Sequence, residues 1–121
     1  MIICIQGLGY VGSAMCVAVA MAKKKFNNKK FKVIGVDLPS FRGKKIINKI
    51  NKGIFPFESN DEKLKLQINK ITKQGILQAT DSPKVFEKAN IVIVSINCDI
   101  KKINGKLEVN IADFKKSIVE V

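Results

Sequence analysis

Four short runs of apolar residues alternate with longer segments of helical character along this chain. The runs are 2–5 (IICI), 31–36 (FKVIGV), 76–80 (ILQAT) and 91–96 (IVIVSI). Continuous apolar runs of this length are typical of strands that are buried on both faces of a parallel sheet. Strands that alternate with helices predict an α/β fold in three layers. We expect strand order 3-2-1-4, right-handed crossovers and helices on both faces of the sheet.

Helices are expected between these runs, at 10–24, 43–52, 59–75 and 83–88, and from residue 110 onward. Ser59 and Glu62 have the spacing of a capping box at the start of one helix. Ser82 is expected to cap the helix that begins at Pro83, and Asn110 the last one. The connections 23–30 and 101–106 are rich in Lys and Asn, and both are predicted to be polar loops.

Two surfaces follow from this pattern. In the first helix, small apolar residues recur at helical spacing, and this face is expected to lie on the sheet. The residues are Val11, Ala14, Met15, Ala18 and Ala22. Later, the loop 54–58 (IFPFE) carries Phe55 and Phe57 between polar helices. These two aromatic rings are expected to be exposed and to form a contact surface.

Glycines follow the first apolar run at once, in the pattern Gly7-x-Gly9-x-x-Gly12. A turn between a buried strand and a helix is the place where such a motif binds phosphate. Gly7 would adopt turn angles that a Cβ disfavours, Gly9 would let a diphosphate approach the backbone, and Gly12 would let the helix pack closely. The helix N-terminus adds free N–H groups and a positive dipole end. The motif alone is also compatible with a structural turn that binds no ligand.

Asp37 ends the second run, and Pro39 stops that strand from continuing. A dinucleotide-binding fold places its ribose-binding acid at this point. The carboxylate would accept hydrogen bonds from the adenosine hydroxyls and repel a 2′-phosphate, so it favours NAD over NADP. Together with the glycine motif, Asp37 predicts a Rossmann-type fold that binds NAD. The turn after the fourth run, at 97–99, should face the same cofactor.

Composition and charge narrow the classes of function. The chain has 121 residues, and 46% of them are hydrophobic, which suits one globular domain. The formal net charge is +12, but Arg42 is the only arginine among 22 basic residues. Arg is the usual reader of phosphates and guanine, so nucleic-acid binding is disfavoured. No run is long enough to span a membrane, and no leader precedes the first strand; both features predict a cytoplasmic protein.

Cysteine and histidine content also limits the chemistry. Cys4, Cys16 and Cys98 have no metal-ligand spacing, and the chain contains no histidine. Cys4 and Cys16 fall in the first strand and first helix, where they are expected to be small core residues. We therefore predict no metal site, no disulfide and no catalytic residue, because a Ser-His or Cys-His nucleophile needs an imidazole.

The motifs together resemble the N-terminal NAD-binding domain of the UDP-glucose/GDP-mannose dehydrogenase family. The segment 7–12 (GLGYVG) matches the family's first turn letter for letter, and 33–37 (VIGVD) is similar to its second strand. Similar features follow at 51–58, with Pro56 and Glu58, and at 77–81. The resemblance covers the whole chain in the right order. The pair Tyr10-Val11 is more specific than the glycines alone.

The resemblance implies a set of cofactor-binding residues. They are Gly7, Gly9, Tyr10, Val11, Gly12, Asp37, Arg42 and Cys98. Arg42 lies five residues after the acid, where the family carries Lys or Arg. Cys98 stands where the family has a threonine that helps to hold the cofactor, and a thiol is the weaker hydrogen-bonding group.

Family members are much longer than 121 residues, so residues 1–121 are interpreted as one NAD-binding domain, an N-terminal fragment of a longer enzyme. The resemblance implies that the whole enzyme is a homodimer, uses a nucleotide-sugar and NAD, and oxidises the C6 alcohol of a UDP- or GDP-sugar to a carboxylate. The fragment alone would be inactive. Two alternatives remain at this point: a stand-alone NAD-sensing module of the transporter or channel type, and a structural or basic nucleic-acid-binding domain.

Overall fold

Four parallel strands form the central sheet of the computed structural model, which describes residues 1–22 and 30–119. Their order is β3-β2-β1-β4, as predicted. The strands are β1 (Ile2–Gln6), β2 (Lys32–Val36), β3 (Leu77–Thr80) and β4 (Ile91–Val94). β1 pairs with both β2 and β4, so the residue after β1 lies at the centre of the sheet's carboxyl edge.

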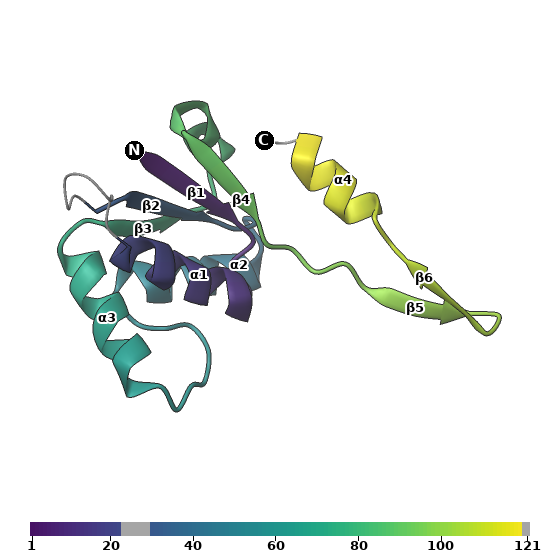
Figure 1. The fold of residues 1–121 in the computed structure, drawn as a ribbon, viewed down its shortest axis with the longest axis horizontal. Helices are drawn as coiled ribbons and strands as arrows, with labels where there is room; N and C mark the ends of the chain where they lie inside the picture. Colours follow the sequence, from purple (N-terminus) through teal and green to yellow (C-terminus); the bar gives the residue numbers. More distant parts are fainter. Residues whose placement is uncertain (23–29, 120–121) are drawn as a thin grey trace.

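Helices cover both faces of this sheet, as expected (Figure 1). One face packs against α1 (Tyr10–Met21), α2 (Phe41–Asn51) and α3 (Glu62–Lys73). The other face packs against η1 (Pro83–Lys88), a 3-10 helix that places Phe86 over Cys4 and β2. The first helix is described to Ala22, so the expected polar connection at 23–29 lies outside the described residues.

The side of α1 that packs on the sheet differs from the predicted one. The buried residues are Gly12, Ser13, Cys16, Val17 and Ala20. Of the predicted face, Val11 is 65% exposed, and Ala18 and Ala22 are also exposed. Apolar residues occur all round this helix, so their spacing carries little information about which side faces the core.

The loop between α2 and α3 also corrects an expectation. Phe55 is buried and Phe57 is half-buried, so the pair forms no exposed contact surface. Instead, both rings pack against Tyr10 at the start of α1, with ring centroids 5.5 and 5.9 Å from the Tyr10 ring. The loop thereby fixes the first turn of α1, next to the glycine motif.

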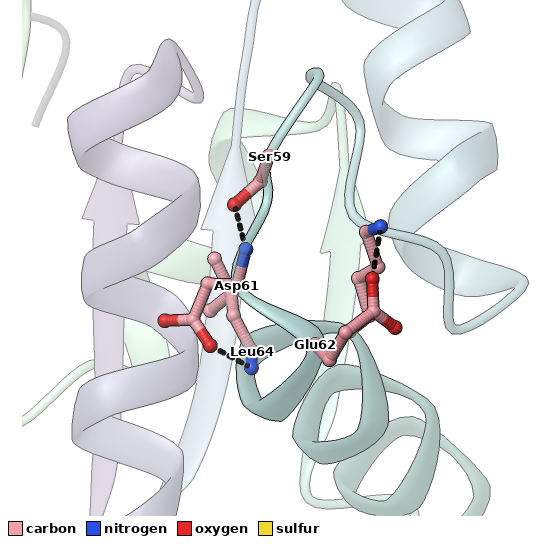
Figure 2. Close-up of polar contacts among 5 residues, drawn as sticks. Ser59, Asp61, Glu62 and Leu64 are labelled. Atoms are coloured by element: carbon pink, nitrogen blue, oxygen red, sulfur yellow. Dashed lines mark hydrogen bonds and ion pairs between the residues drawn. The ribbon is translucent and has the colours of Figure 1, made fainter.

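The start of α3 is capped by a different residue from the predicted one. Figure 2 shows that the Asp61 carboxylate accepts a hydrogen bond from the Leu64 N–H, at 3.0 Å. Ser59 accepts from the Asp61 N–H, and Glu62 pairs with Lys65 at 2.7 Å. The predicted capping box of Ser59 and Glu62 is therefore wrong, because an aspartate two residues further on occupies the N-cap.

Ser82 precedes η1 as expected, but its side chain makes no capping hydrogen bond, and the segment is a 3-10 rather than an α-helix. The fourth strand is shorter than predicted, ending at Val94, and it is only partly buried, with Ile91 46% exposed. This strand lies at the edge of the four-stranded sheet, where a neighbour covers it on one side only.

Residues 100–109 form a β-hairpin and not the predicted polar loop. β5 (Ile100–Ile103) pairs antiparallel with β6 (Lys106–Val109). The turn residues Asn104 and Gly105 have φ values of 50° and 78°, which suit a two-residue hairpin turn. Figure 1 shows the hairpin projecting away from the sheet, and all of its strand residues are exposed.

The last helix, α4 (Ala112–Val119), follows the hairpin and returns toward the end of β4 (Figure 1). The Asn110 side chain accepts from the Ala112 N–H at 3.0 Å, in line with its predicted role at the helix start. The helix has no buried residue, and even the apolar side chain of Ile118 is 49% exposed.

Candidate functional site

The turn after β1 approaches the end of β4 so closely that it has no room for a side chain. Gly7 has φ +90°, and a Cβ there would lie 2.2 Å from the Ser95 carbonyl oxygen. The Gly7 N–H donates to the Val36 carbonyl at 2.8 Å, which ties the turn to the end of β2 as well. The expected conformational role of Gly7 is therefore confirmed.

The other two glycines of the motif differ in what surrounds them. A Cβ on Gly12 would lie 1.8 Å from the Gly7 carbonyl oxygen, so only glycine lets α1 begin this close to the turn. Gly9 caps α1 with extended backbone angles, and a Cβ there would meet nothing within 4 Å. The protein itself therefore does not require a glycine at position 9, and the space beside it is open to a ligand.

Asp37 links the end of β2 to the glycine turn. Its Oδ2 accepts a hydrogen bond from the Leu8 N–H at 3.0 Å, and its Oδ1 accepts from the Leu38 N–H at 2.7 Å. A carboxylate offers about four acceptor positions, so each oxygen retains a lone pair for a ligand hydroxyl. The side chain is half-buried, which leaves it accessible from the cleft beside it.

A cleft of about 530 Å³ opens at the carboxyl ends of the strands. This volume falls in the usual range of small-molecule sites. The turns after β1, β2, β3 and β4, the helix η1 and one side of α4 line it. The lining residues are Gln6, Gly7, Val36, Asp37, Leu38, Pro39, Asp81, Pro83, Phe86, Ile96, Asn97, Asp113, Lys116 and Ser117.

The structure brings together only part of the residue set that the sequence predicted. Gly7 and Asp37 line the cleft, and Gly9 and Gly12 shape the turn beside it. Tyr10 and Val11 form the exposed first turn of α1, Arg42 lies exposed in the first turn of α2, and Cys98 is exposed beyond β4. These last four residues are not among those that line the cleft.

Charge in the cleft is mixed. Asp37, Asp81 and Asp113 supply carboxylates, and Lys116 supplies an ammonium group that has no ion-pair partner in the described part of the chain.

Cys4 and Cys16 are core residues, as predicted. Burial raises the pKa of both thiols, that of Cys16 to about 12, so neither is a nucleophile at neutral pH.

Two parts of the cleft were missed by sequence reasoning. Gln6 is a polar residue at the end of an otherwise apolar strand, which is a usable sequence signal. The α4 residues Asp113, Lys116 and Ser117 reach the cleft through tertiary packing, and no local pattern in the sequence indicates this.

Comparison with known families decides the class of this domain. A sequence model described as "UDP-glucose/GDP-mannose dehydrogenase family, NAD binding domain" matches residues 1–120. The chain belongs to the UDP-glucose/GDP-mannose dehydrogenase family. The matched region is the family's NAD-binding domain, and its cofactor is NAD. This match does not support the alternative of a stand-alone sensing module.

Solved structures agree with the fold. The NDP-N-acetyl-D-galactosaminuronic acid dehydrogenase of Methanosarcina mazei is 24% identical, with a TM-score of 0.83 over 99% of this chain and 24% of that one. GDP-mannose dehydrogenase of Pseudomonas aeruginosa is 25% identical, with a TM-score of 0.76 and the same coverage. UDP-glucose dehydrogenase of Pyrobaculum islandicum is 15% identical, with a TM-score of 0.78 over 99% and 24%.

The chain thus spans about a quarter of the length of these dehydrogenases. No curated protein sequence gives a significant match.

Across residues 1–22 and 30–119, none of the helices has the length and apolar character needed to cross a bilayer. In the same residues, no three acidic, cysteine or histidine side chains gather where a metal ion could bind.

Proposed function

We propose that residues 1–121 are the N-terminal NAD-binding domain of a longer nucleotide-sugar dehydrogenase. In this proposal the diphosphate of NAD lies against the first turn of α1, and the adenosine ribose binds Asp37. The single observation that carries it is the space beside Gly9, where the protein needs no glycine but a closely bound phosphate does.

Each part of the cofactor then meets a group of matching chemistry. The N-terminus of α1 offers backbone N–H groups and a positive dipole end to the diphosphate. Asp37 offers its remaining lone pairs to the ribose hydroxyls, and Leu38 and Ile96 offer apolar surface to the adenine ring. Four exposed residues outside the cleft lining stay predicted contacts of the cofactor: Tyr10, Val11, Arg42 and Cys98.

In the whole enzyme, NAD held by the glycine turn and Asp37 would supply the hydride acceptor for oxidation of the C6 alcohol of a UDP- or GDP-sugar. The contribution of this domain is to hold and orient the cofactor. In this proposal the sugar-binding and catalytic residues of the whole enzyme lie outside residues 1–121, which correspond to about a quarter of the length of the related structures. The homodimeric assembly implied by the family resemblance is proposed for the whole enzyme on the same basis.

Titration calorimetry of the chain with NAD and NADP tests the ribose assignment. Asp37→Ala should weaken NAD binding about 10- to 150-fold, because hydrogen bonds to a charged group contribute about 1.5–3 kcal/mol. Asp37→Asn keeps an oxygen for the Leu8 N–H and removes the charge that repels a 2′-phosphate. This variant should therefore lose NAD affinity and gain NADP affinity. Its stability should fall by about 0.5–1.5 kcal/mol, because the asparagine amide nitrogen cannot accept the hydrogen bond from the Leu38 N–H.

Glu87→Gln is the matched control, because it removes one negative charge from an exposed position on η1 outside the cleft lining. It should leave both affinities unchanged. A wild-type chain that prefers NADP, or an Asp37→Ala variant that binds NAD like the wild type, would show that the ribose lies elsewhere.

A further inference from the structure

Gln6 is a buried polar residue in an otherwise apolar strand. It follows four residues of β1 that are apolar, and it is only 8% exposed. In the described part of the chain, the other buried polar side chain is Ser13, whose hydroxyl donates to the Leu8 carbonyl. The Gln6 amide oxygen has no hydrogen-bond partner there. Burying an unpaired carbonyl oxygen costs stability that an apolar side chain of the same shape would not cost.

The other end of the same amide makes a contact over a long distance in sequence. Gln6 Nε2 donates to the backbone carbonyl of Ser117 in α4, 111 residues away, at 3.2 Å. α4 has no buried residue of its own, so little apolar packing holds it in place. Yet Asp113, Lys116 and Ser117 on this helix form part of the cleft lining.

We propose that Gln6 is a positioning residue that docks α4 as one wall of the nucleotide cleft. Docking of α4 and binding of the nucleotide then strengthen each other, since any ligand that contacts the wall favours the docked helix. The inference rests on the proposed function, because the ligand is the adenosine part of NAD. The Lys116 ammonium makes no ion pair in the described part of the chain, and it is the cationic group of the wall, beside the polar groups of Asp113 and Ser117.

Two glutamine variants distinguish an effect on the docking of α4 from an effect on the stability of the whole fold. Gln6→Met keeps the length of the side chain, removes the unpaired oxygen and breaks the bond to Ser117. Gln67→Met is the matched control: Gln67 is a half-buried residue of α3 whose amide oxygen is also unpartnered, and it is not among the cleft residues. Both variants should unfold at the wild-type temperature or slightly above it.

Hydrogen exchange over residues 112–119, measured first without any ligand, reports the docking of α4. Exchange should be faster in Gln6→Met than in the wild type or Gln67→Met. Calorimetry with NAD should then show a Kd about 3- to 10-fold higher for Gln6→Met, the effect of one hydrogen bond, and an unchanged Kd for Gln67→Met. Added NAD should slow exchange over 112–119 in the wild type.

Equal α4 exchange in all three proteins would overturn the docking role of Gln6. Unchanged NAD affinity in Gln6→Met, with binding that still depends on Asp37, would overturn the inference and leave the proposed function standing. A loss of affinity that merely follows a lower unfolding temperature would also overturn it, because a structural role predicts that pattern. A wild-type chain that binds no NAD would overturn both the proposed function and the coupling of α4 docking to NAD binding. Hydrogen exchange over residues 112–119 without ligand would still test the docking role of Gln6.

Discussion

Adding one methyl group at Gly9 should weaken NAD binding, whereas adding it at Gly12 should lower the stability of the fold. At Gly9, an alanine Cβ meets nothing within 4 Å, and the backbone angles (φ −62°, ψ −173°) suit any residue. Gly9→Ala should therefore fold normally, with a stability within about 1 kcal/mol of the wild type. Alanine restricts the unfolded chain, which stabilises the fold, but it is a poorer N-cap residue than glycine for α1. Its NAD affinity should fall about 10-fold or more, since the methyl group occupies the space where the diphosphate would contact the backbone.

At Gly12 the same methyl group would lie 1.8 Å from the Gly7 carbonyl oxygen. Gly7 has little room to move away, because its Cα packs closely against the Ser95 carbonyl oxygen. Its N–H also donates a hydrogen bond to the Val36 carbonyl. The clash must displace backbone, so Gly12→Ala should cost about 3 kcal/mol, the upper end of overpacking effects. For a chain of this size that cost lowers the unfolding temperature by roughly 10 °C.

Thermal unfolding and calorimetry with NAD measure both variants on the same samples. The expected pattern is a stable Gly9→Ala with weak binding and an unstable Gly12→Ala. Wild-type NAD affinity in Gly9→Ala would refute the argument that a phosphate fills the open space. A large loss of stability in that variant would refute the reading of the backbone geometry.

Two further predictions concern the fold. The Asn51 side chain forms both an accepted and a donated hydrogen bond with the backbone of Ala79, at 2.8 and 2.9 Å, so Asn51→Ala should cost about 2–3 kcal/mol in urea unfolding; a loss below about 0.5 kcal/mol would contradict this. Burial raises the pKa of Cys16 from 9.0 in the unfolded chain to about 12 in the folded protein. Below about pH 9 the thiol is protonated in both states, so its full contribution to stability is present only there. Above pH 9 the stability should fall by about 1.4 kcal/mol per pH unit relative to Cys16→Ala, and equal pH profiles for the two proteins would contradict the assignment.

The sheet and its order could be predicted because each strand is a compact apolar run that glycine, proline or a charged segment ends. The positions of the glycine turn and of Asp37 beside one cleft could be predicted for a related reason: they depend on residue type and local position. The buried side of α1 could not, because its apolar residues surround the helix. The exposure of β4 depends on its place at the edge of the sheet, which the residues of the strand do not encode.

Two other differences between the prediction and the structure have local signals in the sequence. Asn104-Gly105 is a strong signal for a two-residue hairpin turn, but the surrounding lysines favour a loop. Asp61 is as good an N-cap residue as Ser59, but the capping-box spacing between Ser59 and Glu62 favours Ser59, which does not cap the helix. The contribution of α4 to the cleft arises only after the hairpin brings the helix back to the sheet, so no segment of sequence could indicate it.

The hydrogen bond from the Leu8 amide to Asp37 has a consequence for how this domain could change its coenzyme. An acid that only bound ribose could be replaced freely during a switch to NADP. Here the carboxylate that is proposed to bind the ribose also accepts a hydrogen bond from a backbone N–H of the glycine turn. A change of coenzyme preference must therefore keep an acceptor at position 37, which makes Asn or Ser, rather than Ala or Gly, the accessible first step in evolution or in engineering.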